Sequence, residues 1–152
     1  LVTKRAYAYE NAVMEWVERN LLRSLETAAQ EAADPMAALQ AVFMAHVGFV
    51  VRHPGVPRVI FNELQLPDDT PLKNSVRGIL ERYRQLLIRL LGAAESRGLI
   101  ASGIDKAAAG MLFIGAVQGL IMQSMLVRDN GRMPADAERV FALYRNAIRS
   151  TS

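Results

Sequence analysis

Hydrophobic positions recur every three to four residues along most of the chain, which is typical of amphipathic helices packed around a core. Asp34-Pro35 and the segment before Pro71 are typical of helix starts, and Gly98 is typical of a helix end. No segment alternates convincingly with the period of two that a strand requires, so an all-α fold is predicted. The six predicted helices cover residues 3–33 (capped by Thr3), 35–53, 57–65, 71–97, 105–127 and 134–149.

The stretch Asp105–Val127 differs from the others because it carries no charge after Lys106 and has no polar face. A helix that is apolar all round is either covered by protein or spans a membrane. Its length and its Gly115/Gly119 spacing suit a membrane helix. However, two glutamines and a serine reduce its apolarity, and no basic cluster flanks it. We therefore predict a central helix, covered partly by its own chain and partly by a second subunit.

The small residues of this stretch would let the backbone of another helix approach closely. The last helix, apolar on one face, is a natural companion, and two helices from each subunit would form a four-helix bundle. The alternative is that these residues pack only against a neighbour in the same chain. The predicted dimer interface consists of Gly115, Ala116, Gly119, Gln123, Leu126, Val140, Phe141, Tyr144 and Ile148.

Another face of the same stretch is predicted to form one wall of a small-molecule pocket, because methionines adapt in shape and one amide could orient a ligand. His46 lies on an apolar helical face, either as a hydrogen-bonded core residue or as a group that orients a polar ligand atom. Ordinary core packing is the alternative for every member of the set. The predicted lining is Trp16, Phe43, His46, Phe61, Tyr83, Leu87, Met111, Ile114, Gln118 and Met122.

Composition narrows the function classes. The chain has no cysteine, which excludes disulfides and thiolate chemistry, and its two histidines have no nearby acidic partner for a metal. The net charge of +3 is interleaved with acidic residues rather than gathered into a nucleic-acid-binding stripe. Neither nucleotide-binding nor hydrolase motifs occur. We expect no enzyme, no cofactor and no metal. No signal peptide is visible, and the absence of cysteine fits a cytoplasmic protein.

The order of these elements resembles the C-terminal regulatory domain of the TetR (tetracycline repressor-like) family of bacterial transcription regulators. The resemblance covers essentially the whole chain. It rests on HPGVPRVIFNELQ at His53–Gln65, AAESRGLI at Ala93–Ile100, AAAGMLFIGAVQGLIMQ at Ala107–Gln123 and the short final helix. It implies a six-helix orthogonal bundle that binds an effector and dimerises through its last two helices.

The resemblance also implies partners and a mechanism. Residues 1–8 are expected to form the join to an N-terminal helix-turn-helix domain, and operator DNA would be bound only through that domain. A small apolar or amphipathic effector would shift the first helix and change the spacing of the two DNA-binding heads of a homodimer, which releases DNA in a repressor. The alternative is a helical homodimeric interaction module without an effector.

Overall fold

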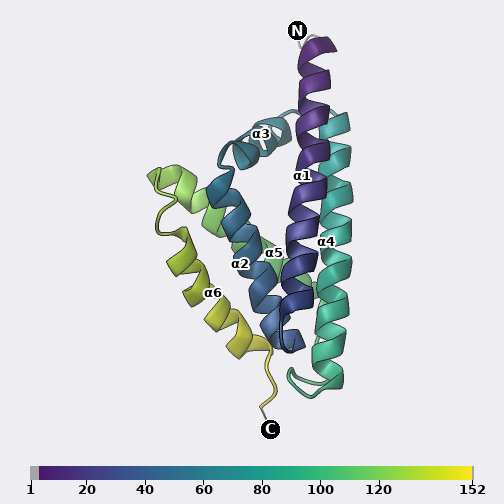
Figure 1. Cartoon of the computed structure of the whole chain (residues 1–152), viewed down its shortest axis with the longest axis vertical. Helices are drawn as coiled ribbons and strands as arrows, with labels where there is room; N and C mark the ends of the chain where they lie inside the picture. The colour runs from purple at the N-terminus through teal and green to yellow at the C-terminus, as the bar shows by residue number, and fades with distance from the viewer. Residues whose placement is uncertain (1–3, 152) are drawn as a thin grey trace.

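The computed structural model describes residues 4–151, which form six α-helices joined by short loops (Figure 1). The predicted all-α class is confirmed for these residues, whose only extended pairing is an isolated bridge between Ile100 and Arg149. The predicted cap Thr3 lies outside the described residues. The helices are α1 (Lys4–Glu31), α2 (Pro35–Arg52), α3 (Gly55–Leu64), α4 (Pro71–Ser96), α5 (Lys106–Val127) and α6 (Met133–Ile148).

Capping residues fix most helix boundaries. Asp34, Thr70 and Asp105 precede α2, α4 and α5, and each side chain accepts a hydrogen bond from the backbone N–H three residues later. Gly98 follows α4 in the left-handed conformation with a φ of 69°, as its position predicts. The helix α5 ends at Val127, as predicted, and its C-cap Arg128 adopts the left-handed conformation with a φ of 54°.

The centre of the bundle is α2, which contacts α1, α4, α5 and α6 (Figure 1). Its Phe43 is fully buried and meets Phe113 of α5 and Phe141 of α6, with ring centroids 5.1 and 5.5 Å apart. Aromatic pairs at such distances add to the free energy gained by removing large apolar surfaces from water. Within one copy of the chain, the helix buried on most sides is therefore α2, and the predicted cover of α5 by a second subunit stays a prediction.

On α5, burial is confined to one side. Ala109, Phe113, Val117 and Ile121 are buried against α2, α4 and α6, while Leu112 on the other side is more than half exposed. By length and composition alone, both α2 and α5 could cross a membrane. Each of them instead packs against at least three other helices of the chain, which is the packing of a helical bundle.

The least attached helix is α3, which packs mainly on α4. It begins at Gly55, earlier than the predicted start at Pro57, and Pro57 is its one buried residue. Its other apolar side chains, including Ile60 and Phe61, are only half-buried. This helix therefore covers the end of the bundle without filling the space beneath it.

Candidate functional site

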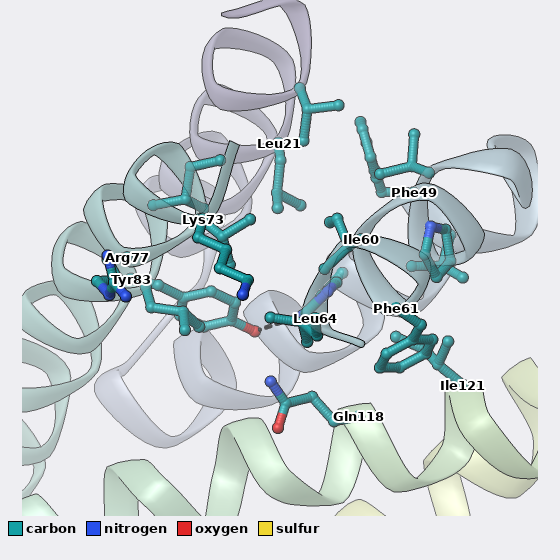
Figure 2. Close-up of a pocket in the computed structure, with 18 residues that line it drawn as sticks. Leu21, Phe49, Ile60, Phe61, Leu64, Lys73, Arg77, Tyr83, Gln118 and Ile121 are labelled. Atoms are coloured by element: carbon teal, nitrogen blue, oxygen red, sulfur yellow. Dashed lines mark hydrogen bonds between the residues drawn. The ribbon is translucent and has the colours of Figure 1, made fainter. Parts of the chain in front are cut away.

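A cavity of about 270 Å³ lies between α3 and the helices it covers, with α1, α2, α4 and α5 forming its other walls (Figure 2). This volume is near the lower end of the roughly 300–1,000 Å³ that small-molecule sites occupy. The apolar lining consists of Val17, Leu21, Phe49, Val50, Val56, Pro57, Ile60, Phe61, Leu64, Val76, Ile79, Leu80 and Ile121. The polar lining consists of His46, Lys73, Arg77, Tyr83 and Gln118.

The side of the cavity formed by α3 follows from the helical periodicity of its apolar residues. Val56, Ile60 and Leu64 are spaced four residues apart, so they lie on one face of α3 and point toward the bundle. Val76 and Leu80 of α4 have the same spacing and line the opposite wall. These apolar faces meet across an opening instead of interdigitating, which leaves room for an apolar molecule.

A hydrogen-bonded pair, His46 and Tyr83, joins α2 to α4 at the wall of the cavity. Nδ1 of His46 lies 2.9 Å from the Tyr83 hydroxyl oxygen. Burial lowers the pKa of His46 from 6.5 to about 4, so the imidazole is neutral at pH 7. Burial also raises the pKa of Tyr83, which keeps the phenol protonated. The pair therefore supplies polar atoms to the cavity without a charge.

Gln118 brings a second uncharged polar group from α5. Figure 2 shows its amide pointing into the cavity toward Tyr83. Within residues 4–151 its side chain makes no hydrogen bond, and the residue is exposed. An amide in this position can donate or accept a hydrogen bond from a bound molecule.

Lys73 and Arg77 mark the solvent-exposed edge of the cavity. The Lys73 ammonium donates to the backbone oxygens of Leu66 and Asp68, the second at 2.6 Å, and Arg77 pairs with Asp69 at 2.8 Å. These contacts tie the loop between α3 and α4 to the first turns of α4. Both cations lie on the polar side of the α4 pattern, and neither belongs to the lining that the sequence predicted.

Four of the ten residues predicted to bind a ligand line the cavity, namely His46, Phe61, Tyr83 and Gln118. Three others are buried in the closed core, namely Phe43, Leu87 and Ile114. The remaining three are at least one-third exposed and lie outside the lining, namely Trp16, Met111 and Met122.

Met111 and Met122 were predicted to line the pocket but lie outside the cavity lining. Met111 and Met122 share a helical face with Gln118, and all three residues are exposed. An all-apolar helix does not reveal which of its sides meets the neighbouring helices. Trp16 is near the cavity without lining it, since its ring packs on Phe49 with centroids 5.8 Å apart. The lining residues that were missed come mainly from α4 and α3. On α3, the four-residue spacing of Val56, Ile60 and Leu64 was an available signal.

The predicted dimer residues of α6 lie in the chain's own core. Phe141, Tyr144 and Ile148 are buried, and the Tyr144 hydroxyl donates to the backbone oxygen of Ala109 at 2.9 Å. Val140 is half-buried against the same core. Within one copy of the chain, α2 and α5 therefore already cover Phe141, Tyr144 and Ile148, and contact of the predicted α6 residues with a second subunit stays a prediction.

The predicted dimer residues of α5 are more exposed than those of α6. Gly115, Gln123 and Leu126 are exposed, while Ala116 and Gly119 are half-buried. A Cβ atom at either glycine would have no described atom within 4 Å, so no neighbour in residues 4–151 uses the close approach that glycine permits. The exposed large apolar side chains on this side of the molecule are Met111, Leu112, Met122, Leu126 and Val127 of α5 and Leu143 of α6.

No protein-family model matches the chain, and neither does any curated protein sequence. Several solved structures do match. A TetR transcriptional regulator from Chloroflexus aurantiacus superposes with a TM-score of 0.77 at 16% identity, covering 91% of this chain and 71% of that one. FadR from Bacillus subtilis, in complex with stearoyl-CoA, gives 0.76 at 19%, covering 91% and 77%. KstR2 of Mycobacterium tuberculosis, a ketosteroid transcriptional regulator, gives 0.74 at 14%, covering 96% and 76%.

The chain therefore has a TetR-like fold over nearly its whole length, and the predicted fold class is confirmed. The matching proteins with a stated role are transcription regulators rather than enzymes. At these identities the likeness establishes the fold, and the function has to be argued from the cavity and the exposed surface of this chain.

Proposed function

We propose that this chain is the regulatory domain of a TetR-like transcription regulator, a cytoplasmic repressor that binds a small apolar or amphipathic effector in the cavity beneath α3. The observation that carries the proposal is an apolar cavity with convergent uncharged polar groups under a loosely attached helix. The stearoyl-CoA complex of Bacillus subtilis FadR supports it by analogy of fold.

The cavity is placed so that a ligand could act on α1. Val17 and Leu21 of α1 form part of the lining, and Phe49 of the lining contacts Trp16 of α1. A ligand that binds one position of α1 more tightly than another shifts the equilibrium between them. The helix-turn-helix domain that would bind operator DNA is proposed to precede α1, so a shift of α1 would change the distance between two such heads.

The exposed apolar surface of α5 and α6 is proposed to bind a second copy of the chain. Leu126 and Leu143 are 78% and 72% exposed, and large apolar side chains exposed on neighbouring helices can mark an interaction site. Pairing of α5 and α6 with their copies about a two-fold axis would bury it in a four-helix bundle. Gly115 and Gly119, which no described neighbour approaches, would then lie at or beside the interface.

Ligand binding can be tested by thermal unfolding of the chain with a panel that includes stearoyl-CoA, decanoyl-CoA and androstenedione. A ligand present at 100 times its dissociation constant should stabilise the fold by about 2.7 kcal/mol, which raises Tm by several degrees. Ile60→Trp, which fills the cavity, should abolish the rise. Ile88→Trp, at an exposed site of α4 outside the lining, should retain it.

Sedimentation velocity on the same samples tests the dimer. A dimer whose Tm no compound changes would favour the interaction module without an effector. A monomer that no compound stabilises would contradict both parts of the proposal.

A further inference from the structure

One ring nitrogen of His46 has no protein partner. Nδ1 is taken by Tyr83, and no other residue in the range 4–151 bonds the imidazole. In the same range, no fully buried polar side-chain atom lacks a hydrogen-bond partner. Nε2 of His46 is therefore not sealed in the core, and since His46 lines the cavity, Nε2 reaches the open space of the cavity.

The Tyr83 hydroxyl decides which nitrogen carries the proton. Tyr83 is 1% exposed, and His46 is its only hydrogen-bond partner among the described residues. A buried phenol needs an acceptor for its hydrogen, and among the described residues Nδ1 of His46 is the one within hydrogen-bond distance. We infer that the Tyr83 hydroxyl donates to Nδ1. A neutral imidazole whose Nδ1 accepts must carry its hydrogen on Nε2.

The cavity thus contains a fixed N–H donor. On the α5 side it also contains the unpartnered amide of Gln118, which can donate as well. The two cations of the lining are engaged at the exposed edge, Lys73 by backbone oxygens and Arg77 by Asp69. A carboxylate beside His46 would lack a cation, and burying an unpaired charge is strongly unfavourable. An uncharged acceptor fits this wall best.

We propose that the effector is an apolar molecule with an uncharged carbonyl group, such as a ketone, ester, thioester or amide, whose oxygen accepts from Nε2–H of His46. This inference rests on the proposed function, because it assigns the chemistry of the molecule that the cavity takes. Tyr83 is a positioning residue, since it acts by fixing the tautomer of His46. A charged part of an amphipathic effector would remain beside Lys73 at the exposed edge.

The test compares butyrophenone with n-butylbenzene, which lacks the carbonyl oxygen and otherwise has the same carbon skeleton. Binding to the whole chain is measured by calorimetry. The ketone should bind about 10-fold tighter, which is the effect of one well-placed hydrogen bond. The double variant His46→Phe/Tyr83→Phe removes both polar partners and keeps the ring shapes, so it leaves no unpaired hydroxyl. It should bind the two compounds with affinities within about 2-fold of each other.

His53→Phe is the matched control, because His53 is the only other histidine and does not line the cavity. It should keep the preference for the ketone. Equal affinities in the unaltered chain would overturn the carbonyl inference and leave ligand binding intact. Retention of the preference in the double variant would also overturn it. Failure of both compounds to bind would overturn the inference together with the apolar cavity of the proposed function.

A second measurement does not depend on the double variant folding. In His53→Phe protein, the single remaining imidazole gives one set of long-range ¹H–¹⁵N correlations. These should show an unprotonated Nδ1 and a protonated Nε2, and butyrophenone should shift the Nε2–H resonance. A protonated Nδ1 would overturn the assignment of the donor.

Discussion

Acid should destabilise this fold through His46. The folded state holds its imidazole with a pKa of about 4, lowered from 6.5 by burial. Between these two values the unfolded chain binds a proton that the folded chain does not, so the free energy of unfolding decreases as the pH falls. The stabilising contribution is complete above pH 6.5 and is lost progressively toward pH 4.

The magnitude follows from the difference between the two pKa values. Each unit corresponds to 1.36 kcal/mol, so the full effect is about 3 kcal/mol between pH 7 and pH 4. A domain of this kind is stable by roughly 5–15 kcal/mol. The loss is therefore a large fraction of the total, and it should be visible well before the carboxylates protonate at their ordinary pKa values near 4.

Urea unfolding followed by circular dichroism at pH 7, 6, 5 and 4.5 measures this loss, with protein concentration held fixed because dimerisation would also affect stability. The double variant His46→Phe/Tyr83→Phe lacks the titrating ring, so subtracting its free energies from those of the unaltered chain isolates His46. His53→Phe should retain the steep decline. Parallel curves for the unaltered chain and the double variant would refute the reasoning, since His46 would then be protonated as readily in the folded state as in the unfolded one.

Three further changes test the surface and the core. Leu126→Glu should make the chain sediment as a monomer, with an unfolding free energy within about 0.5 kcal/mol of the parent monomer. Leu66→Glu, on the loop after α3, should leave the dimer intact. A dimer that persists in Leu126→Glu would contradict the α5 interface. Gly119→Ala should stabilise the monomeric chain by about 1 kcal/mol in denaturant unfolding, because a Cβ atom added at this position would meet no described atom. A loss of stability would instead reveal a close backbone contact within the chain. Tyr144→Phe should lower the unfolding free energy by about 1 kcal/mol through loss of its hydrogen bond with ligand affinity unchanged, and an unchanged stability would show that this bond contributes nothing.

Local signals in the sequence were sufficient to predict where the six helices lie. Asp34, Thr70 and Asp105 act as caps because a short side-chain oxygen satisfies a free backbone N–H wherever it precedes a helix. Gly98 ends α4 because glycine adopts a positive φ without a steric penalty. These effects extend over a few residues, so they can be recognised without knowing what the helix packs against.

The candidate site was only partly predictable for the opposite reason. His46 and Tyr83 were both expected at the pocket, but their hydrogen bond joins residues far apart in the sequence, and no local pattern predicts it. Lys73 was not predicted to line the pocket because it lies on the polar side of its helix, where a long side chain can still reach the edge of a cavity. Which face of the apolar α5 meets the cavity depends on its neighbours, and of the predicted residues Gln118 lines the cavity whereas Met122 does not.

The last helix, α6, shows which properties the sequence determined and which the tertiary structure decided. The spacing of Phe141, Tyr144 and Ile148 determined that one face of α6 would be buried, and it is. The sequence could not decide what would bury that face, because removing apolar surface from water is equally favourable against the same chain or against another subunit. The packing of α2 and α5 decided it: they cover this face of α6 and leave Leu143 on the other face exposed.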